Sequence, residues 1–157
     1  MSQKPVTSID ITYNVSLITL NNLPNNIKLI SEIFTSIANE GISIDMVSKS
    51  AALRGNTTMS FSLLYDDLVK AMSSINKFKD QISNLSIEID SFNTKFCIFG
   101  KNMKDIPGVA ARLFTVLASE EIEVKLVTTS ESDISCLIDE KDADKACESV
   151  KKEFELE

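Results

Sequence analysis

The sequence predicts an α+β protein made of two ferredoxin-like βαββαβ units, each an antiparallel sheet with its helices on one face, the first unit being inserted within the second. Three observations predict this: an internal repeat, the same order of strand and helix patterns in both copies, and a missing last strand in the second copy. The chain has 157 residues, 43% of them hydrophobic and 25% charged, which suits one or two compact domains.

The internal repeat is the strongest signal. Matching residues in its first half lie 80 positions apart: Ile33 and Leu113, Phe34 and Phe114, Ala38 and Ala118, Ile42 and Ile122. Matching residues in its second half lie 75 positions apart: Ser60 and Ser135, Asp67 and Asp142, Lys70 and Lys145, Ala71 and Ala146. Copy one therefore holds five extra residues (80 minus 75) near positions 50–57. Because Gly55-Asn56 follows a polar run there, we expect a longer loop between two strands.

The first half of copy one reads as strand, helix and strand. β-branched and apolar residues at 13–20 predict a strand. Apolar residues at helical spacing predict a helix over 27–38, and Gly41 suits the left-handed residue that ends it. Alternating apolar and polar residues at 42–46 then predict a half-buried strand.

The second half of copy one continues with a strand, a helix and a strand. Residues 59–63 alternate in the same way, and residues 68–75 carry an apolar stripe at helical spacing. Asp66 or Asp67 is expected to cap that helix. Alternation at 86–89 predicts the fourth strand of the unit.

Copy two follows the same order up to its last helix. Strands are expected at 94–99, 122–126 and 134–138, and helices at 109–118 and 143–154. Asp139 is expected as the N-cap of the second helix. The chain then stops without a fourth strand, whereas residues 6–11 form a spare strand-like segment ahead of copy one.

This imbalance predicts how the two units are assembled. A bare sheet edge invites association, so we expect the spare N-terminal segment to fill the missing place in copy two. The first domain is therefore predicted at residues 13–91, and the second at residues 5–12 plus 92–157. Deleting residues 1–12 should then destabilise the second domain more than the first.

The second sheet is expected to be apolar on both faces. In the strand at 94–99, Cys97 and Phe99 lie opposite the core side, and Val127 and Leu137 are expected to join them. An apolar second face predicts burial against another sheet, a helix or a subunit. Self-association, with a homodimer as product, is the simplest form of this.

Composition excludes several classes of function. The net charge is −7 and the isoelectric point about 4.7, which argues against nucleic-acid binding. No apolar run approaches the roughly 18–20 residues that cross a bilayer, and the first five residues hold no apolar signal core. The three cysteines, Cys97, Cys136 and Cys147, are odd in number and widely spaced, which predicts reduced thiols in a cytoplasmic protein and no metal site.

Catalytic machinery is not expected. The chain has no histidine, and its four glycines are isolated, so no glycine-rich phosphate loop is present. No nucleophile is paired with a base, and no cofactor is implied. The acids at 66–67 and 139–142 fit helix capping better than a metal or acid–base cluster.

Several segments, taken in order, resemble the tandem ACT-domain regulatory region of aspartate kinases. They are residues 6–9, 42–47, 106–114, 128–131, 134–140 and Lys145-Ala146. The resemblance covers essentially the whole chain, and the family shows the same inserted-domain arrangement. The kinase domain of such an enzyme is not in this sequence, so the chain is expected to be a stand-alone regulatory protein or the regulatory part of a longer kinase.

The resemblance implies a small amino acid effector, lysine or threonine, bound where the loop before the first helix meets a strand of a partner domain. It also implies a homodimer, an aspartate kinase catalytic domain as partner, and control of the lysine, threonine and methionine branch of biosynthesis. The ligand-binding residues carried over are Asn25, Asn26, Ile27, Lys28, Ile44, Asp45, Lys49, Glu123 and Val124.

The first-helix loop departs from the family pattern. Asn25 stands where the family has an aspartate, and Ile27-Lys28 stands where it has Pro-Gly. Lys49 replaces a glutamine, and Glu123 replaces an asparagine. Glu123 can supply the missing negative charge, whereas Lys28 or Lys49 can meet an acidic ligand.

Plainer interpretations stay open at these positions. Asn25 and Asn26 can simply form a turn and a helix cap, and Asp45 and Glu123 can be solvated charges. The degraded loop also suits a second function, a ligand-free module that only mediates assembly. An RNA-binding role lacks the basic, aromatic sheet face that it requires.

Overall fold

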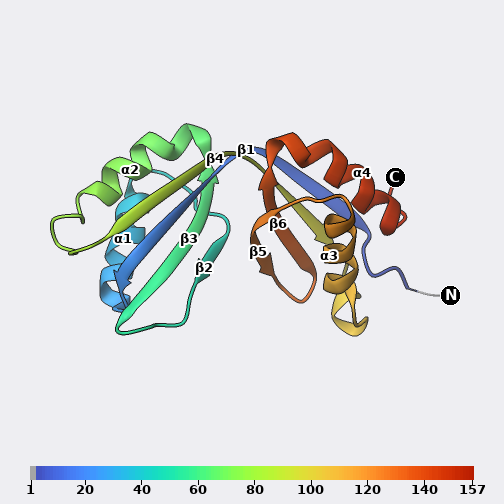
Figure 1. The fold of residues 1–157 in the computed structure, drawn as a ribbon, viewed down its shortest axis with the longest axis horizontal. Helices are drawn as coiled ribbons and strands as arrows, with labels where there is room; N and C mark the ends of the chain where they lie inside the picture. Colours follow the sequence, from blue (N-terminus) through green and yellow to red (C-terminus); the bar gives the residue numbers. More distant parts are fainter. Residues whose placement is uncertain (1–2) are drawn as a thin grey trace. The chain divides into compact units, whose positions relative to one another are not determined.

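The computed structural model describes residues 3–157, and Figure 1 shows their fold. In chain order the elements are β1 (Ser8–Pro24), α1 (Ile27–Asn39), β2 (Val47–Lys49), β3 (Asn56–Leu64), α2 (Leu68–Asn76), β4 (Ser86–Phe99), α3 (Val109–Ser119), β5 (Val124–Thr129), β6 (Asp133–Asp139) and α4 (Ala143–Glu153). The chain divides into two compact units. We call Val15–Ser91 the inserted unit, and the residues up to Asn14 together with Phe92–Glu157 the outer unit.

Two long strands contribute to both units. The strand order is β2-β3-β1-β4 in the inserted unit and β1-β4-β6-β5 in the outer unit, which confirms the α+β class with its antiparallel sheets. The expected separate strands at 6–11 and 13–20 are wrong, because β1 runs through both; β4 likewise joins 86–89 to 94–99. Asn14 and Phe92, where the strands pass between units, have φ of 56° and 64°. A left-handed residue interrupts the side-chain alternation without ending the strand, which explains the error.

In the inserted unit, α1 and α2 cover one face of the sheet (Figure 1). Ile18 pairs with Phe61 across β1 and β3, and both are fully buried. Phe34 of α1 packs against Phe61, with ring centroids 5.2 Å apart and the ring planes tilted by 59°. The apolar spacing of α1 thus meets the alternation of β1 and β3, as the sequence predicts.

The strand expected at 42–46 lies later in the chain than predicted. Ile42 and Met46 are buried as the alternation requires, but regular pairing begins only at Val47. The N–H of Asp45 donates to the Ser62 carbonyl (3.0 Å), and that of Met46 donates to the Ser62 hydroxyl (3.0 Å). Because the Ser62 hydroxyl accepts a hydrogen bond that a backbone carbonyl would accept in a regular ladder, residues 42–46 lie along β3 without regular strand pairing.

In the outer unit, the N-terminal segment completes the sheet and its core. Val6 is fully buried among residues of α3, α4, β4 and β6, and the Thr7 N–H donates to the Phe99 carbonyl (2.8 Å). A Cβ on Gly100 would lie 1.8 Å from the Pro5 carbonyl oxygen. Only glycine therefore allows the segment to approach this closely.

β5 contains an irregularity that overturns one predicted side-chain assignment. Val124 pairs with Ile138, but Leu126 pairs with Leu137, so the register shifts between them. Val127 consequently packs into the core beneath the helices, and not onto the opposite face where it was expected. Leu137 does lie on that opposite face, and it is fully buried.

Helix ends agree with prediction at Gly41, which adopts φ 78° after α1, and differ at two helix starts. Asp139 caps the 3-10 turn over Glu140–Asp142, where its side chain accepts from the Lys141 N–H (3.0 Å), and the N-cap of α4 itself is Asp142. Asp67 stands at the N-cap of α2 but makes no capping side-chain hydrogen bond, so the predicted cap is wrong. A short 3-10 turn over Tyr65–Asp67 leads into α2 and gives Asp67 helical φ and ψ.

Within residues 3–157, no helix is both long and apolar enough to span a membrane. The same residues contain no group of three or more acidic, cysteine or histidine side chains placed to hold a metal ion.

Candidate functional site

The loop between β1 and α1 is organised by Asn26. Its side-chain oxygen accepts from the N–H groups of Lys28 (3.0 Å) and Leu29 (3.3 Å), and so caps α1. The neighbouring Asn25 N–H donates to the Gly55 carbonyl (2.9 Å). The capping interpretation is thereby confirmed for Asn26. A ligand carboxylate approaching this helix end meets two N–H groups that already have an acceptor.

The next two loop residues point into solvent. Ile27 is 78% exposed and Lys28 is exposed, and the first turn of α1 contains no acidic side chain. The helix start therefore combines an exposed lysine with the positive end of the helix dipole. This combination favours a negatively charged group.

The three predicted residues from the next segment lie at different places along the sheet. Ile44 packs against the inserted core, and Asp45 is exposed beside Ser62. Lys49 ends β2, opposite Met59 near the start of β3. At roughly 3.3 Å per residue, Asp45 and Lys49 are separated by about 13 Å along the chain.

One end of the inserted sheet collects most of the predicted residues. Pro24 at the end of β1 pairs with Asn56 at the start of β3. Since β2 runs antiparallel to β3, Lys49 lies at the same sheet end as the Asn25–Lys28 loop. Asp45 lies toward the other end. The structure thus groups the loop with Lys49, and separates Asp45 from them.

Glu123 and Val124 belong to the outer unit. Glu123 is exposed just before β5, and Val124 is half-buried at the first position of that strand. The nine predicted residues therefore divide into seven in the inserted unit and two in the outer unit.

The corresponding helix start in the outer unit is built differently. Gly108 is the N-cap of α3, with φ 88°, and it provides no side-chain cap. Pro107 before it and positive φ at Gly108 match a tight turn of the Pro-Gly kind. The two copies thus present helix N-termini with different chemistry.

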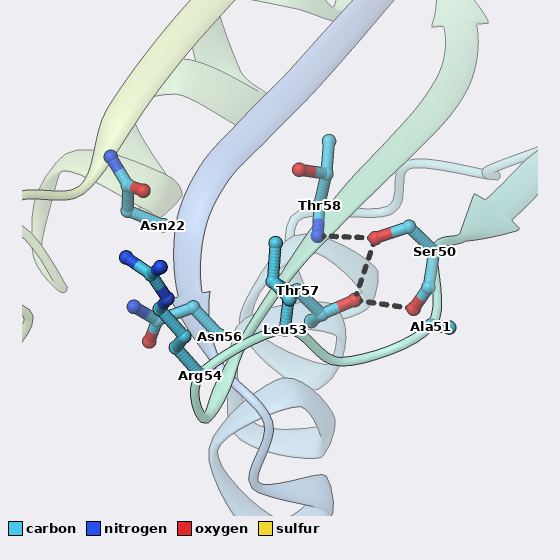
Figure 2. Close-up of a pocket in the computed structure, with 8 residues that line it drawn as sticks. All are labelled: Asn22, Ser50, Ala51, Leu53, Arg54, Asn56, Thr57 and Thr58. Carbon is cyan, nitrogen blue, oxygen red and sulfur yellow. Dashed lines mark hydrogen bonds between the residues drawn. The ribbon is translucent and has the colours of Figure 1, made fainter.

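A surface hollow, which the sequence did not single out as a site, lies beside the connection between β2 and β3. Its volume is about 410 Å³, and Figure 2 shows its lining residues: Asn22, Ser50, Ala51, Leu53, Arg54, Asn56, Thr57 and Thr58. The signal that points to it is the five-residue difference between the copies, which falls on this connection.

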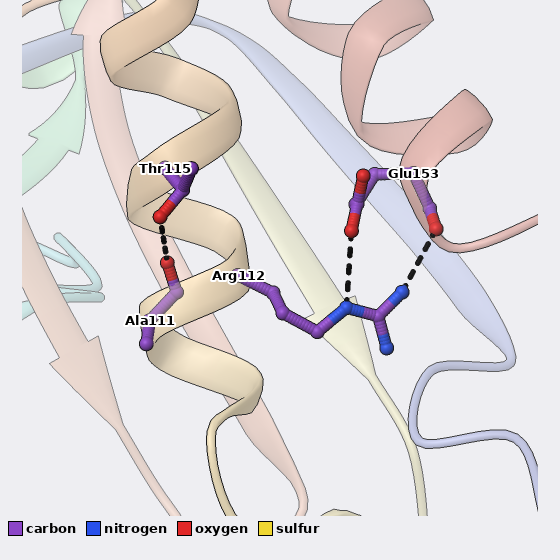
Figure 3. Close-up of polar contacts among 4 residues, drawn as sticks. All are labelled: Ala111, Arg112, Thr115 and Glu153. Carbon is purple, nitrogen blue, oxygen red and sulfur yellow. Dashed lines mark hydrogen bonds and ion pairs between the residues drawn. The ribbon is translucent and has the colours of Figure 1, made fainter.

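Arg112, within the 106–114 segment, has a structural role. Its Nε donates to Glu153 Oε1 (3.0 Å) and its Nη2 to the Glu153 carbonyl (2.9 Å), as Figure 3 shows. Its guanidinium also lies 4.7 Å from the centre of the Phe154 ring. These contacts hold α3 against the end of α4.

The buried cysteine is not a reactive group. Burial, and to a smaller extent the neighbouring Cys97, raise the pKa of the Cys136 thiol to about 12. A thiol with this pKa is protonated at neutral pH and is a poor nucleophile.

Comparison with known proteins agrees with this architecture. Residues 96–154 match the model of an ACT domain family. The aspartokinase of Bacillus sp. (strain MGA3) is 37% identical over 142 residues, covering 90% of this chain and 34% of that protein. Aspartokinase 2 of Bacillus subtilis (strain 168) is 34% identical over 142 residues, covering 90% of this chain and 35% of that protein. The chain therefore spans about a third of the length of these relatives.

Solved structures give the same result over nearly whole chains. The regulatory subunit of aspartate kinase from Thermus thermophilus, in its ligand-free form, superposes with a TM-score of 0.88 at 24% identity, covering 96% of this chain and 99% of that one. A chain of the structure of aspartokinase alpha and beta subunits superposes with a TM-score of 0.86 at 29% identity, again covering 96% and 99%. The chain is thus similar, over nearly its whole length, to the ACT-domain regulatory portion of aspartate kinases.

Proposed function

We propose that this chain senses a small amino acid and transmits its binding to an aspartate kinase catalytic domain, in the lysine, threonine and methionine branch of amino-acid biosynthesis. The observation that carries the proposal is the 37% identity to an aspartokinase over 90% of the chain. We also propose that the two ACT domains comprise residues 13–91 and residues 5–12 plus 92–157. The division into compact units at Asn14 and Ser91 supports these limits.

The effector site that we propose comprises the Asn25–Lys28 loop, Ile44, Asp45 and Lys49 of the inserted unit, together with Glu123 and Val124 of the outer unit. The ammonium group of an amino acid needs a carboxylate partner, for which Glu123 and Asp45 are suited. Because Asp45 lies toward the other end of the sheet from the loop and Lys49, it would act through the second copy of a dimer. The carboxylate group needs positive charge or N–H donors, for which Lys28 and Lys49 are suited.

The Asn26 cap sets a condition on this site. Because its side chain already accepts from the Lys28 and Leu29 N–H groups, a ligand carboxylate must either displace it or bind through lysine side chains. Lysine is the first effector to test, since E. coli aspartokinase III has been solved in complex with lysine and aspartate. Threonine is the second.

We propose that the chain acts in the cytoplasm as a homodimer whose second copy completes the effector site. The catalytic domain can be joined to this chain or be a separate subunit. A regulatory subunit of aspartate kinase is known as a chain of similar extent, in Thermus thermophilus. Sedimentation of the purified chain tests the dimer, because a monomer at all concentrations would contradict a shared site.

Isothermal titration of the chain with each free amino acid tests sensing. We expect saturable heat with one of them, and at least about tenfold weaker binding in Lys49→Ala, because that change removes a charge-assisted contact. Lys145→Ala, which removes a lysine on α4 of the outer unit that is not among the proposed site residues, is the matched control and should bind normally. No heat with any amino acid at millimolar concentration would reject sensing.

A second candidate function is a ligand-free assembly module. The observation that favours it is the loop itself, since Asn25 and Ile27-Lys28 replace the aspartate and the Pro-Gly of the family pattern, and Asn26 occupies N–H groups at the helix start. Co-purification with an aspartate kinase catalytic domain, without any amino acid binding, would distinguish this function from sensing.

A further inference from the structure

We propose that the hollow between Arg54 and Ser50 is a binding site for a small anion bearing a carboxylate or phosphate group. Figure 2 shows its lining residues beside the β2–β3 connection, with Arg54 and Asn22 on one side and Ser50 and Ala51 on the other. Its volume of about 410 Å³ is in the range of small-ligand sites. The proposal does not use the Asn25–Lys28 loop, and the hollow shares only Lys49, at its rim, with the proposed effector site.

The arginine is held on a rigid turn. The N–H of Leu53 donates to the Asn56 carbonyl (2.8 Å), and the N–H of Asn56 donates to the Leu53 carbonyl (3.1 Å). Arg54 and Gly55 between them have φ of 52° and 81°. Two positive φ values in a two-residue hairpin loop define a tight turn whose geometry fixes the Arg54 Cα.

The opposite wall is held by a hydroxyl network. Thr57 is almost fully buried, and its hydroxyl donates to the Ser50 carbonyl (2.6 Å). The hydroxyl groups of Ser50 and Thr57 are also hydrogen-bonded to each other (3.2 Å). The Ser50 hydroxyl also accepts from the Thr58 N–H (3.0 Å). The hollow is thus a prearranged shape, and ligand binding need not order a loose loop.

Charge selects the class of ligand. Arg54 is the one charged side chain among the eight lining residues, and Lys49 adds a second cation at the rim, with its Nζ 3.3 Å from the Ser50 carbonyl. The whole chain carries a net charge of −7, so a local cationic site is a departure from its average. A planar guanidinium with several N–H donors is suited to carboxylates and phosphates.

The other copy provides an internal contrast. The matching connection between β5 and β6 is shorter and carries Glu131, with Asp133 following as the first residue of β6. It is closed by the Ser130 hydroxyl, which accepts from the N–H groups of Ser132 and Asp133 (3.2 Å each). Copy one, with its five extra residues, thus has a cationic hollow at the place where copy two has a short acidic turn.

Two-dimensional NMR of the ¹⁵N-labelled chain tests the proposal, with inorganic phosphate and succinate as separate probes at constant ionic strength. We expect saturable shifts of the amides at 50–58 with at least one probe. Saturation with phosphate alone assigns a phosphate-bearing ligand, and saturation with succinate alone assigns a carboxylate. Sodium chloride at the same ionic strength should cause no saturable change.

The key variant is Arg54→Asn, because Asn-Gly is a preferred pair for this turn and keeps it intact while the charge is lost. We expect at least about tenfold weaker binding of the probe. Lys79→Ala removes another exposed cation of the inserted unit and should bind as the parent does. Absence of saturable shifts with both probes, unchanged binding in Arg54→Asn, or shifts centred on 129–133 would overturn the proposal.

Discussion

The inserted and outer units share the arrangement of the core beneath their helices, and they differ at their loops and on the sheet faces that point away from the helices. On the face away from the helices, the inserted sheet carries hydroxyls, with Thr19 and Ser60 hydrogen-bonded at 3.1 Å, whereas the outer sheet carries the fully buried Leu137. At the helix starts, Asn26 caps α1 by its side chain and Gly108 leaves α3 without one. The residues that the two copies share therefore form the core, whereas the residues outside the core differ and give each copy its own polar groups and charges.

Removing a central aromatic side chain should have the largest effect and should separate the two cores. Phe61 in the inserted unit and Phe96 in the outer unit are both almost fully buried, so each change to alanine should lower the free energy of unfolding by about 3–5 kcal/mol. Chemical denaturation measures the loss, and amide hydrogen exchange locates it. Equal loss of protection in both units from either single variant would contradict two separate cores.

Gly100→Ala should have the next largest effect and should be confined to the outer unit. The added methyl group would lie 1.8 Å from the Pro5 carbonyl oxygen, so the N-terminal segment must move. We expect a loss of about 1–3 kcal/mol, as for other overpacked sites, with faster amide exchange at residues 6–12. Ser132→Ala, in the adjoining turn, is the control, and an effect of Gly100→Ala no larger than this control would count against the close fit.

The two helix starts should respond differently to alanine. Asn26→Ala removes a side-chain cap and should lower the free energy of unfolding by about 1 kcal/mol. Gly108→Ala has no cap to remove, but it places a side chain at φ 88°, which should cost about 1 kcal/mol. The informative difference is in ligand binding: only Asn26→Ala frees N–H groups for a carboxylate and should change effector affinity. Equal changes in affinity from both variants would remove the distinction between the copies.

The smallest effect on stability at neutral pH concerns Cys136. Its pKa is raised by burial to about 12, so its stabilising contribution is present at neutral pH and is lost as pH rises from about 9 toward 12. Comparing alkaline unfolding of the parent and Cys136→Val measures this. In iodoacetamide labelling at pH 8, Cys136 should react far more slowly than the half-buried Cys147. Comparable labelling rates would contradict the burial.

The fold could be predicted from the sequence because the spacing of the apolar residues follows the periods of strands and helices. Phe61 belongs to the alternating pattern of β3 and Phe34 to the helical pattern of α1, and the two side chains are in contact in the core. Strand boundaries were not readable where a local backbone feature breaks the alternation. Phe92 has φ 64°, and the Ser62 hydroxyl takes a ladder position beside Met46; neither feature has a sequence signature.

The candidate site was predictable only in part. Asn26 as a cap follows from its position before an apolar helical pattern. The hollow beside Arg54 did not follow, because its shape depends on hydrogen bonds between Ser50, Thr57 and Thr58 that close a loop of no regular pattern. The length difference between the copies indicates that the β2–β3 connection differs from its counterpart, but it does not predict that a hollow forms there.

The central proposal is that the first-helix loop of the inserted unit is the sensing element. Mapping amino acid binding by NMR on the full chain is its sharpest test. We expect one amino acid to bind saturably and to shift the amide signals of residues 25–28, 44–49 and 123–124, while the signals of 107–112, at the matching helix start of the outer unit, do not shift. Saturable binding centred on 107–112, or no saturable shift with any amino acid, would contradict it.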